Sequence, residues 1–389
     1  MNPNALKNRL FDRILRDHAP CAALSDDLAE HPELSGQEVR SCAQITALLK
    51  ERGFMVETPF AGFSTGFRAV KGGDSHKRKV ALLTEYDALP EIGHACGHCV
   101  SAGISVLAGL ALSSMQDELD ADIHIIGTPA EEAGGAKCIM AAGGVFDRYD
   151  MAMMIHLYNS NMATVRMQAL RCYRFNFHGR AAHASAAPWE GRNALNGLQL
   201  MCVAMDMLRQ HLRPECQLHY CIKNGGAAPN IVPEEASLEL YMRAQSGDVM
   251  DDLQKKIFDC ARGAALATQT EVDWLATGNA YDCLTENEAG TACLRGIYDE
   301  LGIEQNGDEK KTFGSSDAGN VSSRCPTFHP MLQLTPAGVP IHTREFEAAV
   351  HTPVAHDVIA LGAKVIGLQT IRMLTDQALY ADMLRPYGR

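Results

Sequence analysis

The sequence lacks an excess of basic residues and any long hydrophobic run. Its 389 residues include 35 Lys and Arg but 47 Asp and Glu, which leaves a net charge of −12. Non-specific binding to nucleic acid or to an anionic membrane needs a basic face, so this balance argues against both. The longest apolar stretch, Ile104 to Leu112, covers about half of a membrane span. We therefore expect neither nucleic acid nor membrane as a partner.

Patterns that stabilise small secreted proteins are also missing. The 13 cysteines are odd in number and irregularly spaced, which argues against a disulfide framework. Residues 1–20 carry charges throughout and contain no apolar segment, so we expect no secretory signal. Unpaired cysteines are normal in a reducing compartment, and we therefore expect a cytoplasmic protein.

Two common catalytic signatures are absent as well. The sequence contains neither the Gly-x-x-x-x-Gly-Lys-Ser/Thr loop that cradles nucleotide phosphates nor the His-Glu-x-x-His motif of helical zinc sites. Its glycine-rich segments also lack the strand–Gly-x-Gly-x-x-Gly–helix context of dinucleotide-binding proteins. The sequence therefore gives no indication of a nucleotide-binding site.

What the sequence does contain is strands that alternate with helices. This order predicts an α/β sheet, with functional sites at the carboxyl ends of its strands. Helices are predicted over 5–53, 100–115, 288–301 and 354–374, and a Gly/Ser-rich loop over 313–320. The segments that are apolar and β-prone are 79–84, 121–127, 151–156 and 330–335.

The order changes between about 167 and 280, to strand, helix, strand, strand, helix, strand. This βαββαβ order is that of a two-layer, ferredoxin-like sandwich. We therefore predict two domains: one of residues 1–166 and 281–389, with a mostly parallel sheet flanked by helices, and an inserted one of residues 167–280.

The densest cluster of candidate ligands is the segment His94-Ala95-Cys96-Gly97-His98-Cys99. Thiolates and imidazoles are the usual ligands of zinc and related metals. Cys96 and His98 are close enough in sequence to bind one metal or to bracket two. A Cys- and His-rich turn that binds no metal is the alternative for this segment taken alone.

Two adjacent carboxylates, Glu131 and Glu132, follow the segment at 121–127. Acids at the end of a buried strand need a positive partner, and a metal is such a partner. One of the two could be a ligand, and the other a general base toward a water on the metal. The alternative is a solvated helix N-terminus, where acidic residues are favoured.

Two further strand ends carry similar residues. His156 closes the segment at 151–156, where it could be a ligand or an ordinary edge residue. Asp87 follows the segment at 79–84, where it could orient a ligand histidine or cap a turn. Three consecutive strand ends with such residues favour a metal site, because these ends would converge in space.

Eight segments follow one another along the chain: EYDALPEIGHACGHC, GTPAEEAGG, MIHLY, GRAAHASAAPWEGRNAL, APNIVP, YMRA, FGSSDAGNVS and GVPIHT. In this order they resemble the zinc aminoacylase/carboxypeptidase family of metallopeptidases, peptidase family M-twenty. The most similar branch is that of the amidohydrolases that cleave aminobenzoyl-glutamate, auxin–amino-acid conjugates and unusual dipeptides. The resemblance extends from His31 to the C-terminal helix.

The resemblance implies a role for each residue of the cluster. Glu131 would be the general base, and Asp87 the carboxylate behind a ligand histidine. The cofactor would be one or two divalent ions, zinc or manganese. The metal ligands would be Cys96, His98, Glu132, His156 and His342, with His351 as the alternative to His342.

The inserted domain would be a lid and dimerisation domain. By the resemblance, His183 stabilises the oxyanion of the tetrahedral intermediate, and Asn230 and Arg243 bind substrate, Arg243 through a carboxylate. A homodimer or higher homo-oligomer is expected, with His183 reaching its own or the neighbouring subunit's site. Without the resemblance, His183 could be a helix-entry residue and Arg243 a surface charge. Cys99 departs from the family, which commonly has Asp or Asn there; it could be an extra soft ligand or a small packed residue.

We therefore expect a metal-dependent hydrolase that uses water activated by the metal, with Glu131 as the base. Its substrate would be a small N-acyl amino acid, an aminobenzoyl-glutamate-like conjugate or a dipeptide, cleaved at an amide bond. Removal of an amine from a small aromatic acid is the first alternative. The second is a relative that binds metal or ligand without turnover, which the intact Glu131–Glu132 pair argues against. The net charge and the lack of repeated Cys-x-x-Cys pairs disfavour a structural zinc domain for nucleic acid.

Overall fold

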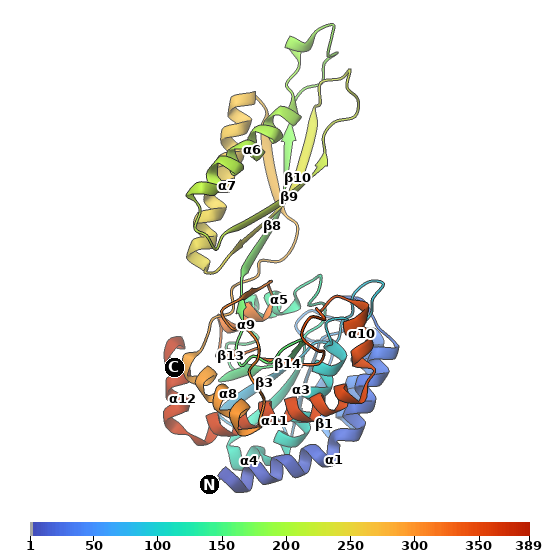
Figure 1. Cartoon of the computed structure of the whole chain (residues 1–389), viewed down its shortest axis with the longest axis vertical. Coiled ribbons are helices and arrows are strands. Elements are labelled where there is room, and N and C mark those ends of the chain that lie inside the picture. The colour runs from blue at the N-terminus through green and yellow to red at the C-terminus, as the bar shows by residue number, and fades with distance from the viewer. Residues whose placement is uncertain (1–2) are drawn as a thin grey trace. The chain divides into compact units, whose positions relative to one another are not determined.

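The computed structural model describes residues 3–389, which form two compact units (Figure 1). One unit comprises the chain up to Arg166 together with Leu284–Arg389, and the other is Met167–Cys283. The second unit is therefore a continuous insertion into the first. The limits that we predicted for this insertion are residues 167 and 280.

A six-stranded sheet forms the centre of the first unit. Its strands, in order across the sheet, are β1 (Phe54–Glu57), β2 (Phe67–Lys71), β4 (Ala121–Gly127), β3 (Arg78–Thr84), β5 (Met151–Met153) and β13 (Thr327–Phe328). The strands from β4 to β13 run parallel to one another, whereas β1 and β2 add an antiparallel edge. A second parallel pair follows β5 and β13 along the chain: β6 (His156–Tyr158) and β14 (Met331–Gln333). The predicted α/β class with a mostly parallel sheet is thus confirmed.

Helices cover both faces of this sheet, because successive side chains of a strand point to opposite sides. Val80 and Leu82 of β3 share a core with the helices on one face, whereas Ala81 and Leu83 share a core with those on the other. Both faces are therefore dry, which explains the continuous apolar run from Val80 to Leu83 in β3. The first face carries α1 (Pro3–Glu30), α3 (His98–Leu112) and α11 (Pro353–Thr375), and the second α5 (Ala136–Ala142) and α9 (Ala318–Ser322).

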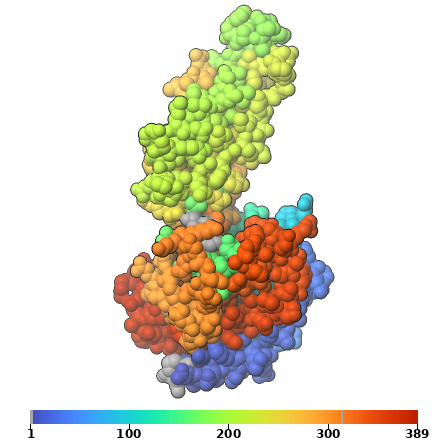
Figure 2. All heavy atoms as spheres, viewed as in Figure 1, coloured from blue at the N-terminus to red at the C-terminus, as the bar shows by residue number. Residues whose placement is uncertain are grey.

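Both ends of the chain contribute to the surface of the first unit. α1 packs against α11, and in Figure 2 the blue N-terminal atoms border the orange-red atoms that precede the C-terminus. The remaining helices of the unit are α2 (Val39–Glu51), α4 (Gln116–Leu119), α8 (Glu288–Glu300), α10 (Arg344–Val350) and α12 (Gln377–Leu384).

Two helical segments of the first unit are long and apolar enough to cross a membrane by length and composition alone. They are His98–Leu119 and Pro353–Thr375, and 94% and 72% of their most apolar windows are buried inside the unit. Core helices of soluble proteins have the same length and composition. Their burial identifies both segments as core helices.

The second unit is a four-stranded antiparallel sheet with two helices on one face (Figure 1). Its strands, in order across the sheet, are β11 (Glu271–Ala276), β8 (Ala169–His178), β10 (Glu235–Ala244) and β9 (Gln217–Asn224). α6 (Ala194–Leu208) and α7 (Gly247–Thr268) pack together over Phe175, Phe177 and Leu240 of the sheet. The order along the chain is strand, helix, strand, strand, helix, strand.

The structure differs from the sequence-based prediction in several elements. The helix predicted over 5–53 is two helices, because the loop at 31–38 contains Pro32 and a left-handed Gly36 with φ 78°. The strand predicted over 151–156 is divided into β5 and β6, and the loop predicted over 313–320 contains the start of α9. The strands β1 and β2 and the helix α12 were not predicted. Two further short strands are β7 (Arg166–Met167) and β12 (Thr312–Phe313).

Candidate active site

Metal-type side chains come together at the carboxyl ends of the parallel strands of the first unit. Donor atoms of Cys96, His98 and His156 lie within 4.8 Å of one another, and all three residues are buried. A second group within the same limit consists of Cys96, Glu132 and His342. Because the two groups share Cys96, all five predicted ligands converge on one region.

A sharp turn between β3 and α3 brings two of these ligands together. Gly97 stands between Cys96 and His98 at the start of α3, with φ 76° in the left-handed region. A Cβ atom at this position would lie 2.9 Å from the Cβ atom of Leu157. Only glycine meets both conditions, so the Cys-Gly-His sequence positions both donors on one turn.

Asp87 holds the imidazole of His98 from behind. Its Oδ1 atom accepts a hydrogen bond from Nδ1 of His98 at 3.0 Å, and both side chains are fully buried. Burial alone raises the pKa of a carboxyl group, but the hydrogen bond and the charge of His98 lower the pKa of Asp87 below its usual range. The pKa of His98 shifts upward. Burial lowers the pKa of the imidazole, but the hydrogen bond to Asp87 and the charge of that carboxylate raise it well above its usual range. The Nε2 atom of His98 is left to face the other donors.

His156 is oriented in a similar way by the backbone. Its Nδ1 atom lies 2.7 Å from the carbonyl oxygen of Leu157, to which it donates. Burial lowers the pKa of His156 to about 3, so the ring is neutral at physiological pH. A neutral imidazole with one nitrogen engaged is the form in which histidine binds a metal.

Several polar atoms of this region have no hydrogen-bond partner among the described residues. They include Oε1 of Glu132 and Nε2 of His98, both buried; the imidazole nitrogen lies 3.3 Å from Oε2 of Glu85, an ion-pair contact without hydrogen-bond geometry. Buried polar atoms without a partner are costly, unless a ligand satisfies them. Thiolate, imidazole and carboxylate together form a donor set that suits zinc and related divalent ions. The residues present therefore fit a divalent metal.

A buried ammonium group lies beside the carboxylates of the site. The Nζ atom of Lys137 is 2.6 Å from Oε1 of Glu85 and 2.6 Å from Oδ1 of Asp317, and all three side chains are fully buried. Carboxylate oxygens of Glu85, Asp317 and Glu131 lie within 4.8 Å of one another. Burial and the charges of Glu85 and Asp317 raise the pKa of Glu131 well above its usual range. Glu131, itself half-buried, therefore occupies a strongly anionic environment that favours a nearby cation.

A further imidazole, that of His329, was not predicted. Its ring stacks on that of His156, with 5.4 Å between the centroids and 24° between the planes. Both ring nitrogens are buried and have no hydrogen-bond partner among the described residues. His329 directly follows β13. The carbonyl oxygens of its two chain neighbours, Phe328 and Pro330, accept hydrogen bonds from the amides of Met154 and His156. The pairing of β13 with β5 thus creates this proximity, and no sequence motif signals it.

Two sequence-based alternatives can be compared with the structure. Cys99 packs in the hydrophobic core on α3, and burial raises the pKa of its thiol to about 12. It belongs to no donor group among the described residues, which favours a packed residue over a ligand.

His351 is exposed and its Nε2 atom lies 2.8 Å from Oε1 of Glu347. Of the two C-terminal histidines, only His342 belongs to a donor group of the described residues.

The second unit contains the other three predicted residues. His183 and Asn230 lie on adjacent loops, since the carbonyl oxygen of Asn230 accepts a hydrogen bond from the amide of Ala184 at 3.0 Å. Arg243 lies near the opposite end of β10, which begins at Glu235. At about 3.3 Å per residue, this strand separates Arg243 from the loops by roughly 25 Å. Within one copy of this unit, His183 and Asn230 are together and Arg243 is apart.

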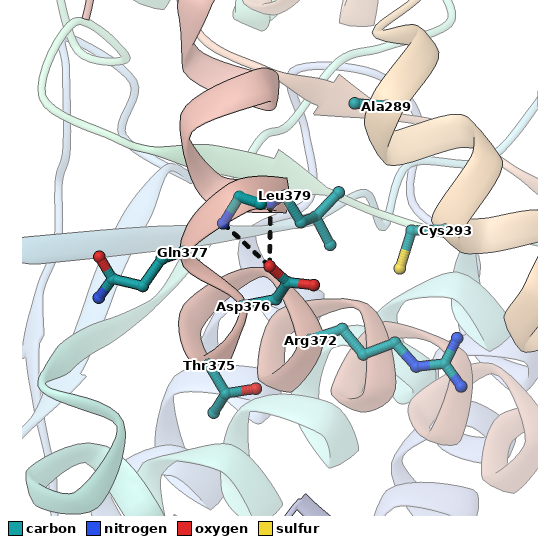
Figure 3. A pocket seen from close by; sticks show the side chains of 8 residues that line it. Ala289, Cys293, Arg372, Thr375, Asp376, Gln377 and Leu379 are labelled. Atoms are coloured by element: carbon teal, nitrogen blue, oxygen red, sulfur yellow. Dashed lines mark hydrogen bonds between the residues drawn. The ribbon is translucent and has the colours of Figure 1, made fainter.

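A surface groove of about 740 Å³ lies between α8, α11 and α12 (Figure 3). Its polar groups are engaged within the fold: Arg372 pairs with Glu300, and Oδ1 of Asp376 accepts from the amides of Ala378 and Leu379 at 2.9 and 3.1 Å. The groove contains none of the predicted site residues. It therefore offers no chemistry comparable to that of the metal-type cluster.

Comparison with known proteins identifies the family. Residues 81–366 match the model of peptidase family M20/M25/M40. The chain belongs to this family. It is 33% identical over 402 residues to the Xaa-Arg dipeptidase of Mus musculus, an alignment that covers 98% of this chain and 92% of the relative. It is 26% identical to one of the subunits of the p-aminobenzoyl-glutamate hydrolase of Escherichia coli (strain K12), with 95% and 92% covered.

Solved structures agree with this assignment at the level of the fold. The YXEP protein of Bacillus subtilis, described as a dinuclear metal-binding peptidase from the M20 family, superposes with a TM-score of 0.70. The superposition covers 92% of this chain and 98% of that protein, at 16% identity. Membership of the M20 family confirms the predicted fold class and the prediction of a metal-dependent hydrolase that acts on amide bonds.

Proposed function

We propose that this M20 hydrolase cleaves a dipeptide or an N-acyl amino acid, with Glu131 as the general base beside a divalent metal centre. One observation carries the proposal: donor atoms of His98, Glu131 and Glu132 lie within 4.8 Å of one another, next to the other ligand candidates. Two carboxylates beside a buried imidazole provide both a ligand and a base. The groove at α12 does not offer this combination.

The ions would be held by Cys96, His98, Glu132, His156 and His342. Two ions, zinc or manganese, are supported by the two donor groups, which have Cys96 in common. When bound, a divalent ion polarises the amide carbonyl and makes a water molecule more acidic.

Glu131 moves the proton in this proposal. Its carboxylate takes a proton from the attacking water and delivers it to the nitrogen of the leaving amine. Lys137 and its carboxylate partners keep the region beside Glu131 polar and dry. His183 would donate a hydrogen bond to the oxyanion; because Arg243 lies roughly 25 Å away within one copy of the second unit, His183 and Arg243 would serve one site only from two different subunits of the dimer. The Nδ1 atom of His183 accepts from the amide of Ala186 at 3.3 Å, which leaves the proton on Nε2.

The substrate class rests on the relatives. A dipeptide is the first choice, because the Xaa-Arg dipeptidase aligns over 98% of this chain. Arg243 would bind the carboxylate of the substrate, a group that dipeptides and N-acyl amino acids both carry. A cytoplasmic homodimer is part of the proposal. The dimer is supported by Tyr241 and Leu275, which are 43% and 48% exposed on the sheet of the second unit.

Two measurements test the proposal. Glu131→Gln is expected to lower kcat by about 100- to 10,000-fold, because the base is lost, while metal content by mass spectrometry stays that of the wild type. Activity on dipeptides with C-terminal Arg, Lys or Glu, on N-acyl amino acids and on aminobenzoyl-glutamate would define the substrate. Turnover that persists in Glu131→Gln, or after complete chelation of metal, would overturn the proposal.

A further inference from the structure

We propose that Glu38 is a positioning residue for Glu131, because its carboxylate fixes the backbone turn from which Glu131 projects. The inference rests on the proposed role of Glu131 as the base. Glu38 lies in the HPELSGQE segment, almost a hundred residues earlier in the chain, and nothing in the proposed reaction yet uses it.

The turn that carries Glu131 has an unfavourable backbone conformation. Ala130 has φ 57°, in the left-handed region that residues with a Cβ atom seldom adopt. Its carbonyl oxygen accepts hydrogen bonds from the amides of Gly134 and Gly135, at 2.9 and 2.6 Å. If Ala130 relaxed to an ordinary conformation, the direction of the next side chain, Glu131, would change.

Two buried carboxylates hold the amides on either side of Glu131. Oε1 of Glu38 accepts a hydrogen bond from the amide of Ala130 at 2.8 Å. Oδ2 of Asp87 accepts one from the amide of Glu132 at 2.9 Å. Hydrogen bonds to a carboxylate are stronger than those between neutral groups, so this pair of contacts can maintain the turn.

Residues 35–38 of the loop before α2 support both of these contacts. Ser35 donates from its hydroxyl group to Oδ2 of Asp87 at 2.7 Å. Oε1 of Glu38 also accepts from the amide of Gly36 at 2.8 Å, and Oε2 accepts from the hydroxyl group of Thr65 at 3.2 Å. Glu38 itself is fully buried. The loop therefore fixes the Glu38 carboxylate at the position where it meets the amide of Ala130.

A simple capping role does not explain Glu38. It precedes α2, yet its side chain makes no capping hydrogen bond to that helix. Glu33 performs this task instead, since its carboxylate accepts from the amides of Arg40 and Ser41 at 3.0 and 2.7 Å. Glu33 and Glu38 thus share a residue type and a loop, but only Glu38 contacts the turn of Glu131.

Four variants separate the effects of the side-chain length at position 38, its charge, and the position of the carboxylate in the loop. Glu38→Gln keeps an acceptor oxygen at the same distance, whereas Glu38→Asp keeps the charge but withdraws the oxygen from Ala130. We expect Glu38→Asp and Glu38→Leu to lower kcat by about 10- to 100-fold with little change in KM, because a small displacement of a reacting group is costly. Glu38→Gln is expected to retain kcat within about threefold of the wild type, since its hydrogen bond to Ala130 remains. The matched control, Glu33→Leu, is expected to lower thermal stability and leave kcat unchanged.

A readout independent of turnover accompanies these rates. Hydrogen–deuterium exchange of the peptide that spans 128–135 is expected to accelerate in Glu38→Asp and Glu38→Leu, and not in Glu33→Leu. Metal content is expected to match the wild type in all four variants. Wild-type kcat and exchange in Glu38→Asp would overturn the inference, as would equal losses of kcat in Glu38→Leu and Glu33→Leu. The proposed function would survive either result if Glu131→Gln is inactive, and it would fall by itself if Glu131→Gln is active.

Discussion

Nδ1 of His98 donates a hydrogen bond to Oδ1 of Asp87 at 3.0 Å, so the two nitrogens of this imidazole have different tasks. The Nδ1 atom fixes the ring, and the Nε2 atom lies 3.3 Å from Oε2 of Glu85. The same imidazole shares a donor group with Cys96 and His156. Asp87 also accepts from Ser35 and from the amide of Glu132 through its other oxygen. One buried carboxylate thus orients the imidazole of His98 and the backbone beside Glu131, the proposed base.

This relationship predicts the effect of Asp87→Asn. The neutral amide holds the imidazole less firmly and makes Nε2 a less basic metal ligand. The affinity for zinc is therefore expected to fall by about 10- to 100-fold. Competition with a chromogenic chelator measures this affinity. Asp259→Asn, which changes an exposed carboxylate in the second unit, provides the control. Equal zinc affinities in the two variants would contradict the role of Asp87.

The pKa of Cys96 predicts that metal binding releases protons. Burial and the carboxylate of Glu132 raise the pKa of the thiol well above its usual range, so in the metal-free protein it is protonated at neutral pH. A metal binds the thiolate, and the proton must leave. Zinc affinity is therefore expected to rise with pH, by about tenfold per pH unit for each proton released.

Calorimetric titrations in buffers of different ionisation enthalpy count these protons. Cys96→Ser is expected to release one proton fewer than the wild type, because the hydroxyl group stays protonated. His98 also releases a proton in both proteins, since Asp87 raises the pKa of its imidazole. The same proton number in wild type and Cys96→Ser would show that the thiol is not a ligand.

The two C-terminal histidines are expected to behave differently. His342 shares a donor group with Cys96 and Glu132, and its Nε2 atom is 4.0 Å from Oε1 of Glu132. We expect His342→Ala to lose bound metal and activity together. His351 pairs with Glu347 at the surface, so His351→Ala is expected to retain both. Elemental analysis of the two purified variants, at equal protein concentration, distinguishes them; metal loss in His351→Ala alone would reverse the assignment.

Local patterns were sufficient for most of the fold. The predicted segments 79–84 and 121–127 correspond to β3 and β4, because mostly β-prone residues end at clear turn signals there. The strands β1 and β2 were missed, since they are short and carry mixed polar and apolar residues at the sheet edge. The helix α12 was missed because its helical pattern continues directly from that of α11.

The candidate site could be predicted only in part from the sequence. Cys96, His98 and Glu132 stand in dense local motifs, and such motifs can be read without a structure. His329, Glu38 and Lys137 cannot be found in this way, because each acts through a partner distant in sequence. Lys137 and Asp317 are 180 residues apart, for example, and only the packing of α5 beside α9 brings them together. Interactions of this kind depend on the completed fold rather than on a local pattern.

The buried ion pairs of Lys137 predict a large loss of stability in Lys137→Met. The ammonium group lies 2.6 Å from both Glu85 and Asp317, with all three side chains fully buried. Removing one partner of a buried ion pair leaves an uncompensated charge, which costs about 3–5 kcal/mol. The expected result is a decrease of that size in the free energy of unfolding of the metal-free protein, measured with urea.

A matched control and a rescue variant test the cause of this loss. Lys255→Met removes an exposed ammonium group that pairs with Asp259 one helical turn away, and is expected to leave the free energy of unfolding almost unchanged. Adding Glu85→Gln to Lys137→Met removes one of the two uncompensated carboxylates, so part of the lost stability is expected to return. If Lys137→Met cost no more than Lys255→Met, the ammonium group would not be what stabilises the two buried carboxylates, and Glu85 and Asp317 would have to share a proton instead.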